Sequence, residues 1–273
     1  MNFVYKIESL SCTYQSDKCV LKIRDLDIKE QKLYFIIGKS GIGKSTLIEA
    51  LGLMSNTINS PTNELYFYDN KQKVDLPKIW SESSDYISDF RNKNYSFIFQ
   101  ENNLMENFTA GENMAFAYMI GGKSFESAHK LLSPLMKEID LPEDIFSKSI
   151  QNLSGGQRQR VSFLRALISD YKVMFCDEPT GNLDEANASI LMTILKRKLN
   201  EHNSTGIIVS HDITLALKFA DYIIVLEEIV DGDHSYGYCS SNSILTKKDE
   251  LWYHADEDKI NEPHHYIASK IAS

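Results

Sequence analysis

The strongest constraint on the fold of this chain is the glycine-rich segment from Gly38 to Ser45, which reads GKSGIGKS. It fills the pattern GxxxxGK[ST], follows the apolar run Leu33–Ile37 and leads into Thr46–Leu51, which has helix-forming character. Glycines let the backbone N–H groups of such a loop turn inward around a phosphate, and the helix start adds positive potential. We therefore predict a strand–loop–helix unit that binds ATP, with Lys44 on the β- and γ-phosphates.

Two acidic residues follow a second apolar run. Val173–Cys176 leads directly into Asp177 and Glu178. Carboxylates at the end of a buried strand are costly without a cation or a donor beside them. Considered alone, the segment is a strand that ends in a polar turn. Beside a phosphate loop it predicts that Asp177 holds Mg²⁺, with the Ser45 hydroxyl as a second ligand, and that Glu178 activates the attacking water.

A second surface suited to anions lies at Leu153–Gln157, with the sequence LSGGQ, ahead of a helix that begins near Arg158. A serine and two glycines at a helix N-terminus present backbone N–H groups and the positive end of the helix dipole. One ATP needs a single phosphate loop, so this surface is surplus within one chain. We predict that it clamps the phosphates of an ATP held by a partner molecule.

The remaining pattern predicts an α/β fold: a P-loop NTPase core with a mainly parallel sheet and flanking helices. Alternating residues in Phe3–Leu10 and Val20–Ile28 predict additional antiparallel strands at the N-terminus. Residues 101–154 predict an inserted α-helical subdomain. In it Thr109–Glu112 forms a capping box, Ser124 caps a second helix, and Pro134 should kink or end that helix.

The predicted division of the chain is a core of residues 1–100 and 155–228, the helical subdomain 101–154, and a divergent C-terminal hairpin or tail, 229–273. Asp, Gly, Ser and Asn concentrate at 231–243, and we expect a loosely structured tail. The pair His264–His265 could suggest a metal. Nothing nearby supplies the remaining ligands, so surface histidines are the favoured interpretation.

Charge and cysteine content narrow the class of protein. The net charge of −9 and the absence of a dominant basic block disfavour nucleic acid as a partner. Four scattered cysteines without CxxC spacing indicate a reducing cytosol, and Cys176 is expected to be a buried thiol. The N-terminus does not resemble a signal peptide and no run reaches about 18 apolar residues, so a separate chain would have to supply any membrane pore.

From about residue 3 to 226 the chain resembles the nucleotide-binding subunit of ABC transporters, because Leu153–Gln157 matches that family's signature and the other motifs follow in the family's order. The resemblance implies that Ser154 and Gly156 contact the γ-phosphate held by the opposite subunit. It also implies that Tyr14 stacks on adenine, although Tyr14 could instead pack in the core. His211 matches the histidine that contacts the γ-phosphate.

The resemblance assigns two further residues. Gln100 matches the glutamine that senses Mg²⁺ and water and links to the membrane partner, and Asp184, in the loop Gly181–Asp184, matches the aspartate that communicates across the dimer. The catalytic residues expected are therefore Glu178, His211 and Gln100, and the metal ligands are Ser45, Gln100 and Asp177. The residues expected to bind nucleotide are Tyr14, Gly38, Lys39, Ser40, Gly41, Ile42, Gly43, Lys44, Ser45, Thr46, Ser154, Gly155, Gly156, Gln157 and Asp184.

A narrower resemblance points to the lipoprotein-releasing, macrolide-export and cell-division ATPases, through Arg91–Asn92, Thr109–Asn113 and Glu178–Asp184. Members of that subgroup pair with permeases that transmit force across the membrane. Two features depart from the pattern. Lys39 replaces the more usual small residue or proline, and the sequence after Glu228 matches nothing in the family.

The sequence therefore predicts an ATPase that dimerises around two Mg-ATP, most simply with an identical cassette, and drives an integral membrane permease from the cytoplasmic face of the cell membrane. One alternative is an ATPase that regulates a cell-division or cell-wall machine through a membrane partner. A soluble ABC ATPase of DNA repair or translation is disfavoured, because the chain lacks a long coiled coil and carries a single cassette.

Overall fold

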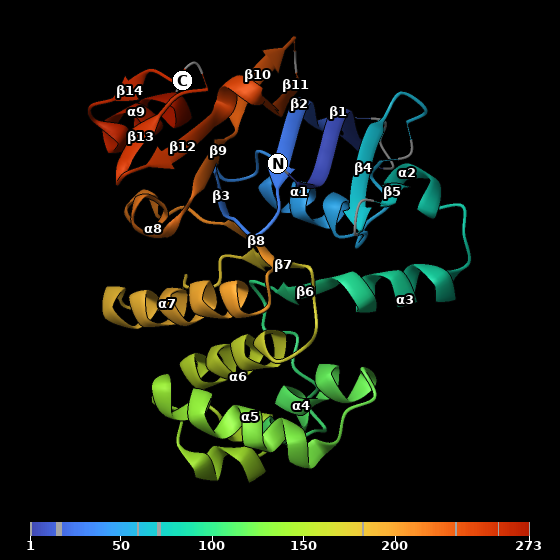
Figure 1. The fold of residues 1–273 in the computed structure, drawn as a ribbon, viewed down its shortest axis with the longest axis vertical. Coiled ribbons are helices and arrows are strands. Elements are labelled where there is room, and N and C mark those ends of the chain that lie inside the picture. The colour runs from blue at the N-terminus through green and yellow to red at the C-terminus, as the bar shows by residue number, and fades with distance from the viewer. Residues whose placement is uncertain are drawn as a thin grey trace. The chain divides into compact units, whose positions relative to one another are not determined.

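The computed structural model describes residues 2–14, 18–58, 60–69, 72–181, 183–232, 234–255 and 257–272. The contacts between residues divide the chain into two compact units, Met1–Arg91 with Thr205–Ser273, and Asn92–Ser204. Each unit carries part of the predicted machinery (Figure 1).

The N-terminal strands of the first unit form the predicted antiparallel arrangement. β1 (Phe3–Thr13) pairs with β2 (Cys19–Lys29) and with β4 (Glu64–Asp69), which pairs with β5 (Gln72–Asp75). The side chains of β1 and β2 alternate between buried and more exposed positions along much of each strand, as expected where one face covers a core.

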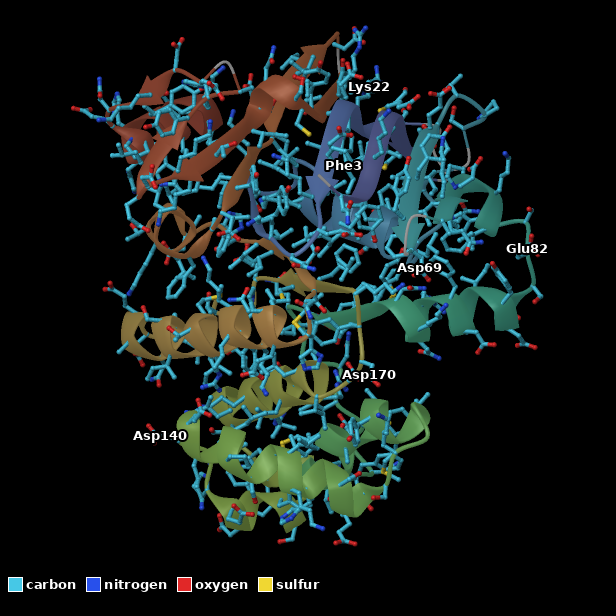
Figure 2. All side chains as sticks on the ribbon, viewed as in Figure 1. Phe3, Lys22, Asp69, Glu82, Asp140 and Asp170 are labelled. Atoms are coloured by element: carbon cyan, nitrogen blue, oxygen red, sulfur yellow. The ribbon has the colours of Figure 1, made fainter. Side chains whose placement is uncertain are left out.

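Two later strands extend this sheet past β2. β11 (His234–Ser240) runs parallel to β2, and β10 (Glu227–Asp231) lies antiparallel to β11 at the edge. Lys22 of β2, labelled in Figure 2, places its ammonium 4.3 Å from the centroid of the Tyr236 ring on β11. Residues 227–231 and 234–240 are thus built into the same sheet as the beginning of the chain.

A second sheet in this unit is parallel at its centre. β3 (Leu33–Ile37) lies between β8 (Thr205–Val209) and β9 (Tyr222–Val225), and both neighbours run parallel to it. Every residue of β3 and β8 is buried, which explains their continuous apolar character. α1 (Lys44–Leu51) follows β3, and α8 (Ile213–Phe219) follows β8. The predicted P-loop core is confirmed.

The C-terminal segment is ordered structure, so the expectation of a loosely structured tail was wrong. β12 (Ile244–Lys248) adds to β9 in antiparallel fashion, β13 (Leu251–Tyr253) and β14 (Lys259–Ile260) continue the sheet, and α9 (Pro263–Ala272) packs on α8. These elements are orange to red in Figure 1. The apolar side chains that they bury are Leu245, Trp252, Ile260 and Ile267.

His264 and His265 are exposed on α9, and no group of three or more metal-binding side chains occurs among the residues that the structure describes. Their exposure confirms that both histidines lie at the surface.

The second unit contains the parallel pair β6 (Tyr95–Ile98) and β7 (Val173–Asp177) and a helical part. In the helical part α4 packs against α5 and α6. The helices and short 3₁₀ turns of the chain not yet given are α2 (Leu76–Ile79), α3 (Ser84–Asn94), α4 (Ala110–Ile120), α5 (Phe125–Glu138), η1 (Glu143–Ser147), η2 (Ile150–Asn152), α6 (Gly155–Leu167), α7 (Glu185–Glu201) and η3 (Ser241–Ser243). No helix in the described ranges is long and apolar enough to cross a bilayer.

The predicted caps of α4 and α5 are confirmed. The Thr109 hydroxyl accepts a hydrogen bond from the Glu112 N–H (3.2 Å), and the Glu112 carboxylate accepts one from the Thr109 N–H (2.7 Å). Ser124 caps α5. Pro134 does not end α5, which continues to Glu138. Leu132, Leu135 and Met136 are buried on either side of it, and this packing offsets the hydrogen bond that the proline cannot make.

Candidate functional site

The phosphate loop joins β3 to α1 in the first unit. Gly41 and Gly43 have φ angles of 77° and 99°, in the left-handed region that only glycine enters without strain. These two residues turn the backbone so that the chain reverses between the buried end of β3 and the first turn of α1. The loop therefore ends on a helix N-terminus, where unpaired N–H groups favour an anion.

Lys44 lies across this loop. Its side chain is 6% exposed, and its ammonium donates hydrogen bonds to the backbone carbonyls of Gly38 (2.9 Å) and Lys39 (2.7 Å). A buried lysine needs such acceptors. A phosphate in the loop would offer this ammonium negatively charged oxygens, which are stronger acceptors than carbonyls.

Tyr14 lies beside the loop and not in the core. Its hydroxyl is 3.0 Å from the Thr46 hydroxyl, and 43% of the residue is exposed. Thr46 itself is buried, and Ser45 is half-buried. The structure thus brings Tyr14, Lys44 and Thr46 together around one loop and leaves the tyrosine ring accessible. The alternative of a core-packing tyrosine is wrong.

His211 approaches the loop from the neighbouring strand. β8 runs parallel to β3, so the carboxyl ends of both strands lie at the same edge of the sheet. His211 lines a cavity of about 300 Å³ with Gly38 and Lys39. The other residues that line this cavity are Ile37, Ile213, Ala268, Ile271 and Ala272. The last three belong to α9, so the end of the chain reaches the edge of the phosphate loop.

In the second unit, the two predicted acidic residues lie at the C-terminal end of β7 and directly after it. Asp177 is the last residue of the strand and is half-buried. Glu178 follows with a φ of 50°, a left-handed conformation that is uncommon for a glutamate. Strained backbone of this kind persists where surrounding structure enforces it, often at functional sites. Here a buried side chain from α6 supports the turn, because the Gln159 amide donates a 2.7 Å hydrogen bond to the Pro179 carbonyl.

Gln100 is exposed in the loop that follows β6. Two side chains fix this loop within the second unit. Arg165 of α6 donates to the carbonyls of Asn102 (3.0 Å) and Asn103 (2.8 Å), and the buried Asn113 of α4 bonds both the N–H and the carbonyl of Met105. Our sequence reasoning assigned no role to Gln159, Asn113 or Arg165, because nothing in the local pattern marks their distant partners.

α6 begins at Gly155, three residues before the predicted start near Arg158, so that Gly155, Gly156 and Gln157 form its first turn. Ser154 and Gln157 form a reciprocal capping box: the Gln157 side chain accepts from the Ser154 N–H (2.9 Å), and the Ser154 hydroxyl accepts from the Gln157 N–H (3.3 Å). A Cβ on Gly155 would meet nothing within 4 Å, and one on Gly156 would meet only the end of Arg160, at 3.9 Å. Packing within this chain therefore does not require these glycines, and the surface above them is open.

Asp184 caps α7 by accepting a hydrogen bond from the Asn187 N–H (2.9 Å), and this bond lowers the pKa of its carboxyl. Asp184 is exposed, so the cap does not bury its side chain. Of the predicted segment Gly181–Asp184, Asn182 lies outside the described residues.

Comparisons with known proteins agree with this geometry. The family model "ABC transporter" matches residues 21–181. The lipoprotein-releasing system ATP-binding protein LolD of Wigglesworthia glossinidia brevipalpis is 36% identical over 78% of this chain and 90% of its own length. The macrolide export ATP-binding/permease protein MacB of Mannheimia succiniciproducens is 37% identical over 78% of this chain, which spans 31% of that protein.

Solved structures lead to the same family. The ABC transporter cassette MJ0796, solved as a dimer, superposes with a TM-score of 0.67 at 28% identity, over 81% of this chain and 93% of its own. A post-hydrolysis dimer of the same cassette, bound to ADP and Pi, gives a TM-score of 0.68 at 27% identity, over 85% and 98%. With its phosphate loop, acidic strand end and LSGGQ helix start, this chain belongs to the ABC transporter family and is an ATP-hydrolysing cassette of that family.

Proposed function

We propose that this chain is the ATPase subunit of a transporter of the lipoprotein-release or macrolide-export kind, and that two cassettes, most simply identical, close around two Mg-ATP. The observation that carries the proposal is the second anion-binding surface at Ser154–Gln157. It is capped, open and not required by packing within the chain. Each ATP would be held by the phosphate loop of one chain and by this surface of the other.

The proposed roles follow the chemistry of each side chain. Lys44 and His211 neutralise the γ-phosphate, Tyr14 stacks on adenine, and Gln100 orients the attacking water. The hydroxyl of Ser45 and the carboxylate of Asp177, with Gln100, would hold Mg²⁺, since these are the oxygen donors that this ion prefers. When bound, the ion neutralises charge on the phosphate oxygens. Asp184 would communicate with the partner cassette from the start of α7.

Glu178 is proposed as the general base. It follows β7 in a left-handed conformation, so its carboxylate leaves the strand in a direction different from that of Asp177. As a base it accepts the proton of the water that attacks the γ-phosphorus in line with the leaving ADP oxygen. The protein otherwise contributes positioning and charge neutralisation.

The test is the Glu178→Gln variant, which keeps the size of the side chain and removes its basicity. Removing a general base costs roughly 10²- to 10⁴-fold in turnover. We expect ATP binding to be retained, with kcat reduced by that factor. Lys44→Ala serves as the matched comparison and should lose binding itself. Hydrolysis by Glu178→Gln at a near-normal rate would remove Glu178 from this role.

A membrane permease is the proposed partner, and the helical part of the second unit offers a surface for it. α4 carries apolar side chains on its exposed side as well as on its buried side. The exposed apolar side chains around its C-terminal half and the start of α5 are Phe116, Met119, Ile120 and Phe125. Exposed apolar patches commonly mark protein interfaces. The name of the MacB relative, which couples ATP-binding and permease functions in one protein, supports the same partner.

The cassette would accordingly lie on the cytoplasmic face of the cell membrane, attached through the permease. We propose that the functional division follows residues 1–100 with 155–228 as the ATPase core and 101–154 as the part that contacts the permease. Cross-linking from cysteines placed at Phe116 or Met119, followed by identification of the captured protein, tests this partner. Capture of ribosomal proteins, or of DNA in parallel pull-downs, would contradict it.

A further inference from the structure

The hairpin formed by β10 and β11 lies directly against the phosphate loop. The Leu226 N–H, just before β10, donates to the Ile37 carbonyl (2.8 Å), and a Cβ on Gly38 would lie 3.0 Å from the Leu226 carbonyl oxygen. At the other end of the loop, a Cβ on Gly237 of β11 would overlap the carbonyl oxygen of Ile42. The loop is therefore in contact with the residue just before the hairpin at one end and with the hairpin itself at the other.

An ion pair joins the phosphate loop to the hairpin. The Lys39 ammonium, in the phosphate loop, lies 3.0 Å from a carboxylate oxygen of Glu228 on β10. Their side chains are 36% and 30% exposed, so water reaches both only in part. Lys39 first, and then Ser235 on β11, hold the pKa of the Glu228 carboxyl below its usual range. Glu228 is thus ionised at neutral pH, and its ion pair with Lys39 joins β10 to the phosphate loop.

The same lysine residue is joined to the phosphate-binding lysine through its backbone. The Lys39 carbonyl accepts the shorter of the two hydrogen bonds from the Lys44 ammonium, at 2.7 Å. Ser40 and Gly41, the next residues, are exposed. A continuous series of contacts therefore runs from Glu228 through the side chain and carbonyl of Lys39 to the ammonium of Lys44.

We propose that Glu228 is a positioning residue for nucleotide binding, which acts through Lys39 to hold the phosphate loop and Lys44 in the geometry that accepts phosphates. The inference rests on the proposed role of Lys44. It assigns a purpose to Lys39, the residue at which this phosphate loop departs from the usual small residue or proline, and it extends the binding machinery into the hairpin that follows β9.

A positioning role and a purely electrostatic role of Glu228 predict opposite changes in nucleotide affinity when its carboxylate is removed. If Glu228 acted only through its negative charge, its removal would strengthen the binding of anionic nucleotides. If it acts by holding Lys39, its removal should weaken binding. Glu228→Gln keeps the shape of the side chain and thus separates the two cases.

Glu227 provides a matched control on the same strand. It is the neighbouring residue, so its side chain leaves the other face of β10. It also forms an ion pair, with Lys270 of α9, at 3.1 Å, and its side chain is likewise 30% exposed. Glu227→Gln removes the same charge from a similarly exposed pair, both members of which lie outside the phosphate loop.

The experiment is calorimetric titration of the full chain with Mg-ADP. A partly exposed ion pair contributes about 0.2–1 kcal/mol, which corresponds to a change of roughly 1.4- to 5-fold in Kd. We expect Glu228→Gln and Lys39→Met each to raise Kd by up to about 5-fold, and the double variant to be no weaker than Lys39→Met. Lys39→Arg, which can keep the pair, should lose less affinity than Lys39→Met, and Glu227→Gln should bind close to wild type. The difference between Glu228→Gln and wild type should shrink in high salt.

Binding by Glu228→Gln that equals or exceeds that of wild type would overturn the inference, and so would an equal loss in Glu227→Gln. Thermal unfolding of each variant, measured alongside, identifies any loss caused by a general defect in folding. If the unmodified chain bound no nucleotide, the proposed function would fail first, and the inference would fall with it.

Discussion

Replacing Gly237 with alanine should displace the phosphate loop, although Gly237 lies almost 200 residues further along the chain than the loop. Gly237 pairs with Leu21 of β2 on one side and with Glu228 of β10 on the other, so its backbone is fixed within the sheet. The added Cβ would overlap the Ile42 carbonyl oxygen and lie 3.3 Å from the carbonyl carbon. Both are backbone atoms of the loop, so no side-chain rotation relieves the overlap.

The size of the effect follows from this geometry. Carbon and oxygen in contact normally stay about 3.3–3.6 Å apart, so the loop and β11 must separate by roughly 1 Å. Overpacking of this kind costs about 1–3 kcal/mol of stability. Misplacing a group that binds substrate by about 1 Å can cost ~10²-fold in rate. We therefore expect kcat/KM for ATP to fall on the order of 10²-fold while the protein remains folded.

The assay is steady-state ATP hydrolysis, with urea unfolding of the same samples. Gly232→Ala is the control, because Gly232 lies in the turn of the same hairpin with a φ of 61° and nothing within 4 Å of its Cβ position. It should lose roughly 1–2 kcal/mol of stability through its left-handed backbone and keep normal kcat/KM. Normal kcat/KM in Gly237→Ala, or an equal loss in Gly232→Ala, would refute the reasoning.

Three further predictions concern stability and reactivity. Thr109→Ala removes the capping box of α4 and should cost about 1 kcal/mol, measured by urea unfolding, and Thr109→Ser should restore most of it. Gly111→Ala places a Cβ 2.5 Å from the Phe146 ring and should cost roughly 1–3 kcal/mol, a loss that Phe146→Leu partly relieves. With a thiol reagent at pH 8 the native protein should react mainly at Cys19, which is partly exposed, and Cys19→Ser should abolish the rapid phase. The other three thiols, Cys12, Cys176 and Cys239, are buried. Burial raises their pKa and keeps them protonated at pH 8.

The elements that the sequence predicted best are those with a long local signal. Leu33–Ile37 and Val173–Asp177 are strands with the predicted bounds, since a continuous apolar run that ends in a turn motif identifies both ends of a buried strand. The C-terminal strands lack such a signal. Leu245, Trp252 and Ile260 lie in runs of only one to three apolar or aromatic residues, and their burial depends on partners such as β9, which local sequence does not reveal.

The candidate site likewise contains residues that local sequence identifies and contacts that it does not. The phosphate loop and the LSGGQ helix start are short motifs, so their residues could be identified directly. The contacts that support them join distant parts of the chain: Lys39 and Glu228 are 189 residues apart, and Arg165 lies 62 residues from Asn103. Spacing and composition carry no information at that range. The left-handed backbone of Glu178 was equally beyond prediction, because glutamate does not normally favour it.

The central claim is that each ATP site needs residues from two chains, and sedimentation of Glu178→Gln with Mg-ATP tests it most directly. This variant should form a dimer with ATP and remain a monomer with ADP. Adding Ser154→Arg, which fills the open surface at the start of α6, should leave ATP binding per chain intact and abolish the dimer. If the double variant still dimerised with ATP, or lost ATP binding as a monomer, the Ser154–Gln157 surface would not serve a partner's nucleotide and the account would be contradicted.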